Sequence, residues 1–121
     1  MREDSPTHFV RFKRKRGVYE RGIELVVQVQ AALDYVKVRH FLKDKLDRSV
    51  TNIVLQIARA ETELPSRRWK MYREAWELAN EVRVQLDIVA AQQAELDDRL
   101  LRASATARKL CEELGRLSAG R

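Results

Sequence analysis

The residues with the clearest capacity for chemistry are cations that crowd the start of the chain. Residues 1–16 hold six Lys or Arg against Glu3 and Asp4, so they carry +4 of the net charge of +6. Closely spaced cations displace counterions from phosphates, which makes contact with a polyanion one interpretation. A solubilising tail is the other, because basic runs also occur in proteins that bind no nucleic acid. The predicted nucleic-acid-binding residues of this stretch are Arg11, Lys13, Arg14, Lys15 and Arg16.

A second group of cations follows Pro65, at the start of the third predicted helix. Cations at a helix N-terminus oppose the macrodipole, so they gain little locally and favour an external anion. The alternative is neutralisation by nearby carboxylates, in part through i, i+4 pairs of Lys70 with Glu74 and of Arg73 with Glu77. The predicted binding residues are Arg67, Arg68, Lys70 and Arg73, and the neutralising candidates are Glu61, Glu63, Glu74 and Glu77.

Side chains that support catalysis or cofactor binding are sparse. His8 and His40 are the two side chains that titrate near neutrality when unperturbed. The sequence contains no Gly-rich phosphate loop, no Cys and His cluster, and no Glu-x-x-His motif of two-metal bundles. The single Cys111 has no partner in the chain for a disulfide. We therefore expect a protein that is not an enzyme and that holds no metal or cofactor.

The elements that position the cations are predicted to be helices throughout. Apolar residues recur at helical spacing over about residues 18–36 and again over about 42–60, and Pro65 breaks the pattern. From Tyr72 to Leu117 the apolar phase never changes, which alone would predict one long helix or a coiled coil. Only Gln93, a polar residue at a core position, indicates a turn between two antiparallel helices.

Within the helix predicted over about residues 42–60, the stretch 46–60 has an apolar surface wider than a single stripe. Leu46, Val50 and Ile53 mark one face, and further apolar residues extend it onto the flanks. Such a helix needs cover from the other helices of its own protomer, from another copy, or from both. The predicted oligomer interface comprises Val54, Leu55, Ile57 and Ala58, with Trp69 and Trp76 as core or interface anchors one heptad apart.

These patterns predict one domain in three parts. Residues 1–16 are expected to form a mobile basic N-terminal arm, residues 17–117 the helical bundle, and residues 118–121 a frayed C-terminus. The sequence has no run of about 18 apolar residues, and its first residues lack the apolar core of a secretory signal. We therefore expect a cytoplasmic protein without a membrane partner.

The segment Arg48–Ala58 resembles the second-helix signature of four-helix-bundle proteins encoded in 23S rRNA intervening sequences. That signature reads roughly Arg-Ala/Ser-x-x-Ser-Ile-x-x-Asn-Ile-Ala-Glu-Gly. The similarity covers about residues 18–115, with Gln56 in place of the usual Asn and Arg59-Ala60 in place of Glu-Gly. Trp76-Glu77-Leu78 also stands where the family often has Arg-Gly-Ser. The third helix contributes, in the family's order, Tyr72, Arg73, Ala75, Glu81, Val82, Leu86 and Asp87.

The resemblance implies an all-α, antiparallel up-down four-helix bundle with a turn near residues 91–94. It also implies a ring-like homo-oligomer, a pentamer, because the family includes the accessory variability determinant proteins of diversity-generating retroelements. Those proteins form pentameric barrels that bind nucleic acid and a reverse transcriptase. The expected function is therefore binding of RNA or DNA through pooled basic surface. The alternative is a protein-interaction scaffold that docks on a reverse transcriptase or a ribonucleoprotein and owes its positive charge to that acidic partner.

Overall fold

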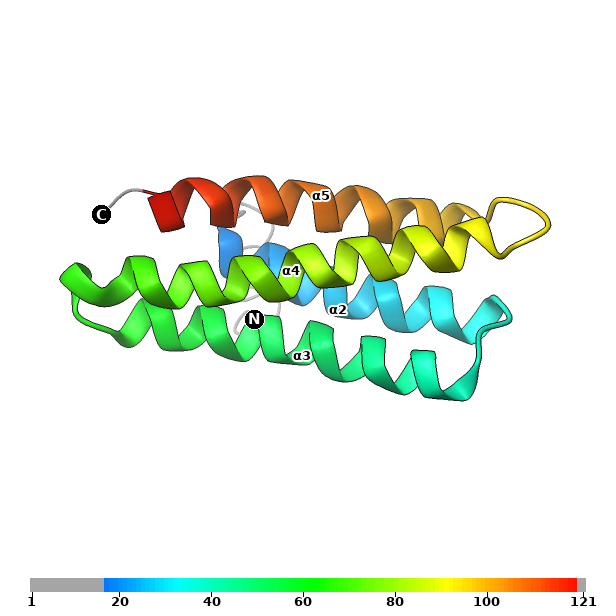
Figure 1. Cartoon of the computed structure of the whole chain (residues 1–121), viewed down its shortest axis with the longest axis horizontal. Coiled ribbons are helices and arrows are strands. Elements are labelled where there is room, and N and C mark those ends of the chain that lie inside the picture. The colour runs from blue at the N-terminus through cyan, green and yellow to red at the C-terminus, as the bar shows by residue number, and fades with distance from the viewer. Residues whose placement is uncertain (1–16, 120–121) are drawn as a thin grey trace, which may run out of the picture.

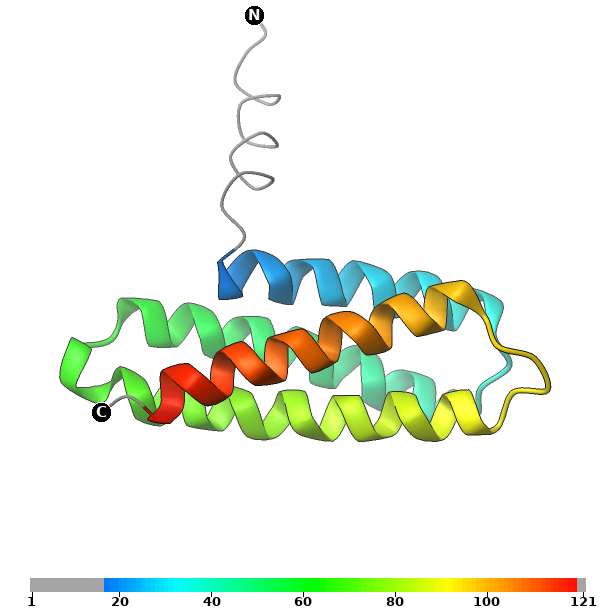
Figure 2. The ribbon, with the colours of Figure 1, turned by 90° about the horizontal axis from the view of Figure 1, so that it is seen from above.

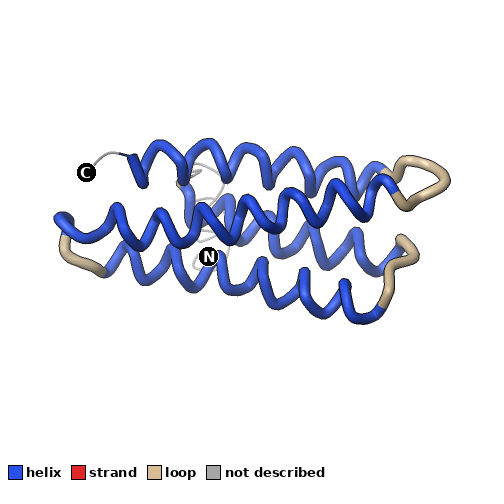
Figure 3. Tube along the Cα trace, viewed as in Figure 1, coloured by secondary structure: helices blue, strands red, loops and turns tan. Residues whose placement is uncertain are grey.

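A computed structural model describes residues 17–119 of the chain, and every regular element in this part is a helix (Figure 3). The predicted basic arm and residues 120–121 lie outside the described residues. The elements are α2 (Val18–Tyr35), α3 (His40–Thr62), the short 3-10 helix η1 (Pro65–Arg67), α4 (Arg68–Ala91) and α5 (Asp98–Ala119).

The four long helices lie side by side, and each runs antiparallel to the next in the chain (Figures 1 and 2). α3 packs between α2 and α4, and α5 closes the bundle by packing against both α4 and α2. The α2–α3 and α4–α5 connections lie at one end, and the α3–α4 corner lies at the other (Figure 1). The prediction of an all-helical, up-down four-helix bundle is confirmed. None of the described helices is both long and apolar enough to cross a bilayer.

The turn predicted at Gln93 is present between α4 and α5. The Gln93 side-chain amide donates to the Val89 carbonyl oxygen and to the Lys37 carbonyl oxygen, both at 3.1 Å. It therefore closes the end of α4 and ties the two neighbouring connections together. The next helix begins at a cap that the sequence analysis did not identify, because Asp97 Oδ1 accepts from the backbone N–H groups of Arg99 at 2.8 Å and Leu100 at 3.4 Å.

The core forms along the inner faces of all four helices. On α3 the inner residues are fully or almost fully buried, and equivalent apolar residues of the other three helices surround them. Ile57, predicted to lie at an oligomer interface, is fully buried inside its own protomer, whereas Leu55 remains 55% exposed. The wide apolar surface of α3 is thus mostly covered within one chain. The Ile57 side chain in particular is inaccessible to a second copy.

Two glycines let neighbouring helices approach closely. A Cβ atom at Gly22 would lie 3.3 Å from Val54 Cγ2 and 3.4 Å from Ile57 Cδ1, so α2 packs tightly on α3 at this point. A Cβ atom at Gly115 would lie 3.4 Å from the indole nitrogen of Trp76, which packs against α5. This close packing explains why a residue of low helix propensity stands in the second turn of α2.

The last helix continues beyond the predicted end of the bundle at residue 117. α5 ends at Ala119, and Ser118 is buried with its hydroxyl donating to the Gly115 carbonyl oxygen at 3.0 Å. The Ser118 side chain satisfies one of the carbonyl groups that a helix C-terminus leaves without a partner in the helix.

The two neighbouring positions on α3 provide a matched test of the core. We expect Ile57→Asp to destabilise the protomer by roughly 5 kcal/mol or more, because it places a carboxylate without a partner in apolar surroundings. That loss approaches the whole stability of a small domain, about 5–15 kcal/mol. Leu55→Asp should keep the helical circular dichroism and a cooperative thermal transition. A folded Ile57→Asp protein with an unchanged midpoint would contradict the core described here.

Candidate nucleic-acid interface

Charge is distributed unequally between the bundle and the stretch that precedes it. Residues 17–119 contain 17 Lys or Arg and 16 Asp or Glu, so the described bundle is close to neutral. The five predicted binding residues between Arg11 and Arg16 lie outside the described residues. Most of the chain's net positive charge therefore precedes the bundle in the sequence, directly before Gly17.

The second predicted cluster lies at the corner between α3 and α4, and Arg68 has a structural role there. Its Nε donates to the Glu63 carbonyl oxygen at 3.0 Å, and its Nη2 lies 3.5 Å from the Glu61 carbonyl oxygen. These carbonyl groups belong to the C-terminal end of α3, where carbonyls lack helical partners and carry partial negative charge. Arg68 is half-buried and caps α3, so it is less available to a ligand than the sequence suggested.

Arg73 is also engaged within the protomer. Its Nε lies 3.9 Å from Glu77 Oε2, and its guanidinium carbon lies 5.5 Å from the centre of the Trp76 ring. Of the two predicted i, i+4 pairs, Arg73–Glu77 is present, whereas Lys70 forms no ion pair with Glu74 in the described part of the chain. An exposed pair such as Arg73–Glu77 stabilises a protein by less than about 1 kcal/mol. Arg73 remains exposed and its charge is partly neutralised.

Arg67 and Lys70 are the two cations of this cluster that stay available. Both are exposed, and no ion pair or side-chain hydrogen bond holds either one within the described residues. They lie in η1 and in the first turn of α4, where cations oppose the helix macrodipole. The structure thus places all four predicted cations at one corner and leaves two of them free for an anion.

Two carboxyl groups lie close to each other where α2 begins and α3 ends. Burial raises the pKa of Glu61, the nearby negative charge of Glu20 raises it further, and Arg68 opposes both effects. Burial also raises the pKa of the Tyr72 hydroxyl, with Glu61 acting in the same direction. The α3–α4 corner therefore holds the exposed cations Arg67 and Lys70 together with Glu61, whose raised pKa means that its charged form is less favourable in the folded protein than in water.

The six predicted interface residues fall at three separate places. Val54 of α3 packs next to Gly22 of α2. On α3 as well, Leu55 is exposed and Ala58 is half-buried. Ile57 is in the core, and Trp76 packs near Gly115 on the far side of α4, with Trp69 two turns earlier on the same side. Val54, Leu55 and Ala58 of α3 can therefore belong to one surface, and the two tryptophans of α4 belong to another. Sequence reasoning missed Val27 of the adjacent α2, which is 59% exposed.

A groove of about 440 Å³ runs between α3 and α4, but its charge does not suit a polyanion. The Gln56 side-chain amide donates to Glu74 Oε1 at 2.7 Å across this seam. Within residues 17–119, no group of three or more His, Cys, Asp or Glu is placed to hold a metal ion. The groove is lined by Gln56, Glu74, Glu77, Leu78 and Glu81.

Comparisons of the chain with protein families, with curated proteins and with solved structures find no match.

The capping role of Arg68 predicts that two adjacent arginines contribute differently to stability. Arg68→Ala should lower the free energy of unfolding by about 1–2 kcal/mol, because it removes charge-assisted hydrogen bonds to the end of α3. Arg67→Ala should change it by less than about 0.5 kcal/mol, as is usual for an exposed site. Urea unfolding of the two variants checks this. Equal effects would contradict the capping role.

The raised pKa of Glu61 predicts a stability that depends on pH. A carboxyl whose pKa is higher in the folded state favours folding when protonated, and this advantage is lost as the pH rises through the folded-state pKa. Glu61→Gln should therefore raise the unfolding midpoint at pH 7, and the gain should vanish below the ordinary Glu pKa of about 4.3. Glu95→Gln, on the α4–α5 connection, is the matched control. A midpoint for Glu61→Gln below that of the unmodified protein at pH 7 would rule out this interpretation.

Proposed function

We propose that the chain is a non-catalytic, homo-oligomeric helical bundle that binds nucleic acid through its basic surface. The observation that carries this proposal is the separation of charge, with +4 over residues 1–16 beside a bundle that is close to neutral. A dense cationic stretch binds phosphates by releasing their counterions, and it needs no particular base sequence. The resemblance to the intervening-sequence proteins supports the same function.

The bundle contributes cations at its α3–α4 corner. Arg67 and Lys70 are exposed and free of ion pairs among the described residues, so a phosphate can approach them without breaking a contact. Arg73 adds charge at the edge of the same corner, but it shares that charge with Glu77. The corner is a supplementary contact, and the stretch before the bundle supplies most of the binding.

Assembly of several copies would multiply both groups of cations. Val27 on α2 and Leu55 on α3 are large apolar side chains that the protomer leaves more than half exposed on adjacent helices. Their burial between copies is favourable at roughly 25 cal/mol per Å² of apolar area. A ring-like homopentamer is the assembly that the family resemblance implies, and pooled charge in such a ring strengthens the field that attracts a polyanion.

A protein-interaction scaffold is the second candidate function. It is favoured by Val84 and Ile88, two exposed apolar side chains on α4 beyond those of α2 and α3. A reverse transcriptase or a ribonucleoprotein with an acidic surface is the partner that this alternative requires. Binding to such a partner that tolerates moderate salt would favour the scaffold, whereas steep salt dependence with unrelated nucleic acids favours the first proposal.

Replacing three cations before the bundle tests the proposed binding surface. Arg14, Lys15 and Arg16 are changed together to Gln, and a control protein carries Lys45, Arg102 and Lys109 changed to Gln, which removes the same net charge from the bundle surface. At about 0.1 M salt the first variant should lose affinity for a mixed-sequence oligonucleotide roughly tenfold or more, with a shallower salt dependence. The control should lose much less. Equal losses would show that only net charge matters, against a localised binding stretch.

A further inference from the structure

The α2–α3 connection, residues 36–39, forms a ridge on which two cations are exposed to solvent. Val36 and Val38 are half-buried and pack against the core, whereas the alternating residues Lys37 and Arg39 are exposed. The Lys37 carbonyl oxygen also accepts a hydrogen bond from the Gln93 side chain at 3.1 Å. The backbone that carries Lys37 and Arg39 is therefore held by the packing of the two valines on the core and by the hydrogen bond from Gln93 of the α4–α5 connection.

An exposed aromatic ring that packs against a guanidinium lies at the start of this ridge. Tyr35 is 66% exposed, and the guanidinium carbon of Arg99 lies 3.8 Å from the centre of its ring. Arg99 is in turn placed by Asp97, whose Oδ2 lies 3.5 Å from Arg99 Nη1 and whose other oxygen caps α5. One face of the ring is thus covered by a guanidinium that is itself held in place. A ring ordered in advance loses less conformational entropy when a ligand stacks on it.

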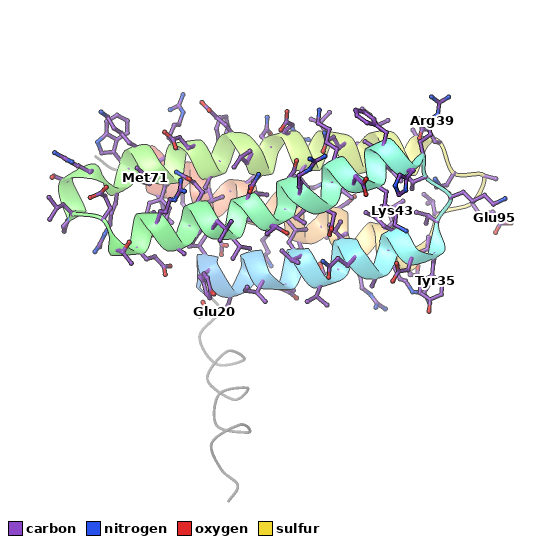
Figure 4. The ribbon with its side chains drawn as sticks, turned by 90° about the horizontal axis from the view of Figure 1, so that it is seen from below. Glu20, Tyr35, Arg39, Lys43, Met71 and Glu95 are labelled. Atoms are coloured by element: carbon purple, nitrogen blue, oxygen red, sulfur yellow. The ribbon has the colours of Figure 1, made fainter. Side chains whose placement is uncertain are left out.

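A second exposed ring lies at the other end of the ridge. Phe41, in the first turn of α3, is 74% exposed. Figure 4 shows Tyr35, Arg39 and Lys43 at the same end of the bundle, with Tyr35 and Arg39 at opposite ends of the connection. Two uncovered rings therefore flank the cations of the ridge instead of joining the core.

The carboxylates near the ridge form no ion pair with Lys37 or Arg39 in the described part of the chain. No acidic residue occurs between Tyr35 and Lys43, but an acidic residue lies on either side of this stretch. Asp34 is exposed and lines a groove with Lys43 and Asp44, and Asp44 lies 3.4 Å from the His40 ring nitrogen. On the neighbouring connection Asp97 caps α5 and pairs with Arg99, while Glu95 is exposed. Asp98, the first residue of α5, is also exposed. Lys37 and Arg39 have no side-chain ion pair among the described residues.

We propose that this end of the bundle binds single-stranded nucleic acid, with a base stacked on the open face of Tyr35 and phosphates contacting Lys37 and Arg39. Aromatic rings interleaved with cations are the arrangement that recognises unpaired bases along a charged backbone, and a base inside a duplex offers no free face to such a ring. The inference rests on the proposed function and adds to it a preference for unpaired strands. It also adds a contact site at the opposite end of the bundle from the α3–α4 corner.

The test compares the unmodified 121-residue chain with its Tyr35→Ala and Tyr35→Phe variants. The probes are a fluorescent oligothymidylate and a DNA duplex of the same length, at about 0.15 M salt, where purely electrostatic binding by the basic stretch is weakened. Tyr35→Ala should bind the single strand at least about fivefold more weakly, as expected for loss of one stacked base. Its affinity for the duplex should not change. Tyr35→Phe, which keeps the ring, should bind both probes like the unmodified protein.

The outcomes separate this inference from the proposal on which it rests. If the unmodified protein binds the probes and Tyr35→Ala retains full affinity for the single strand, the stacking site is wrong and the exposed rings suit a protein partner instead. Equal losses on single strand and duplex would also overturn stacking. If the unmodified protein binds neither probe, the proposed function itself fails. Because Tyr35 is exposed, the thermal midpoint of both variants should stay unchanged, which confirms that they are folded.

Discussion

The structure depends on the burial of the inner face of α3 among the other three helices. Leu46, Val50, Ile53 and Ile57 are at most 1% exposed, and residues of α2, α4 and α5 complete the same core. Gly22 brings α2 close enough to cover Val54 and Ile57, and the Gln93 turn returns the chain so that α5 can close the bundle. Because one chain covers this face, a second copy can contact only residues at the surface of the protomer and not those of its core.

Much of this fold could be predicted from the sequence, because helical periodicity reports which residues share a face. Pro65 marked the one clear break, and Gln93 alone indicated the turn between the last two helices. Periodicity does not report how much of a wide apolar face the neighbouring helices cover, so Ile57 and Leu55 could not be told apart. Arg67 and Arg68 are likewise adjacent cations in the sequence. The position of the last turn of α3 decides that Arg68 donates to the Glu63 carbonyl oxygen and caps this helix, whereas the Arg67 side chain has no such contact among the described residues. The contact between Tyr35 and Arg99 joins the end of α2 to the start of α5, two helices that are far apart in the sequence, and no local pattern indicates it.

The distribution of charge limits how this chain can bind a polyanion. The described bundle is nearly neutral overall, so attraction must come from local groups or from the stretch before it. Two local groups lie at opposite ends of the bundle, one at Arg67 and Lys70 and one at Lys37 and Arg39. The acidic groove between α3 and α4, lined in part by Glu74, Glu77 and Glu81, lies between these two ends. A strand that contacts both ends would therefore favour the faces away from this groove.

The central claim is that folding and most of the polyanion binding belong to separable parts of one chain. The most direct measurement compares the full chain with a chain that begins at Gly17, by thermal unfolding and by oligonucleotide binding over a range of salt concentrations. The account predicts the same unfolding midpoint for both, together with a lower affinity and a shallower salt dependence for the shortened chain. A shortened chain that binds as tightly and with the same salt dependence, or one that no longer folds, would contradict it.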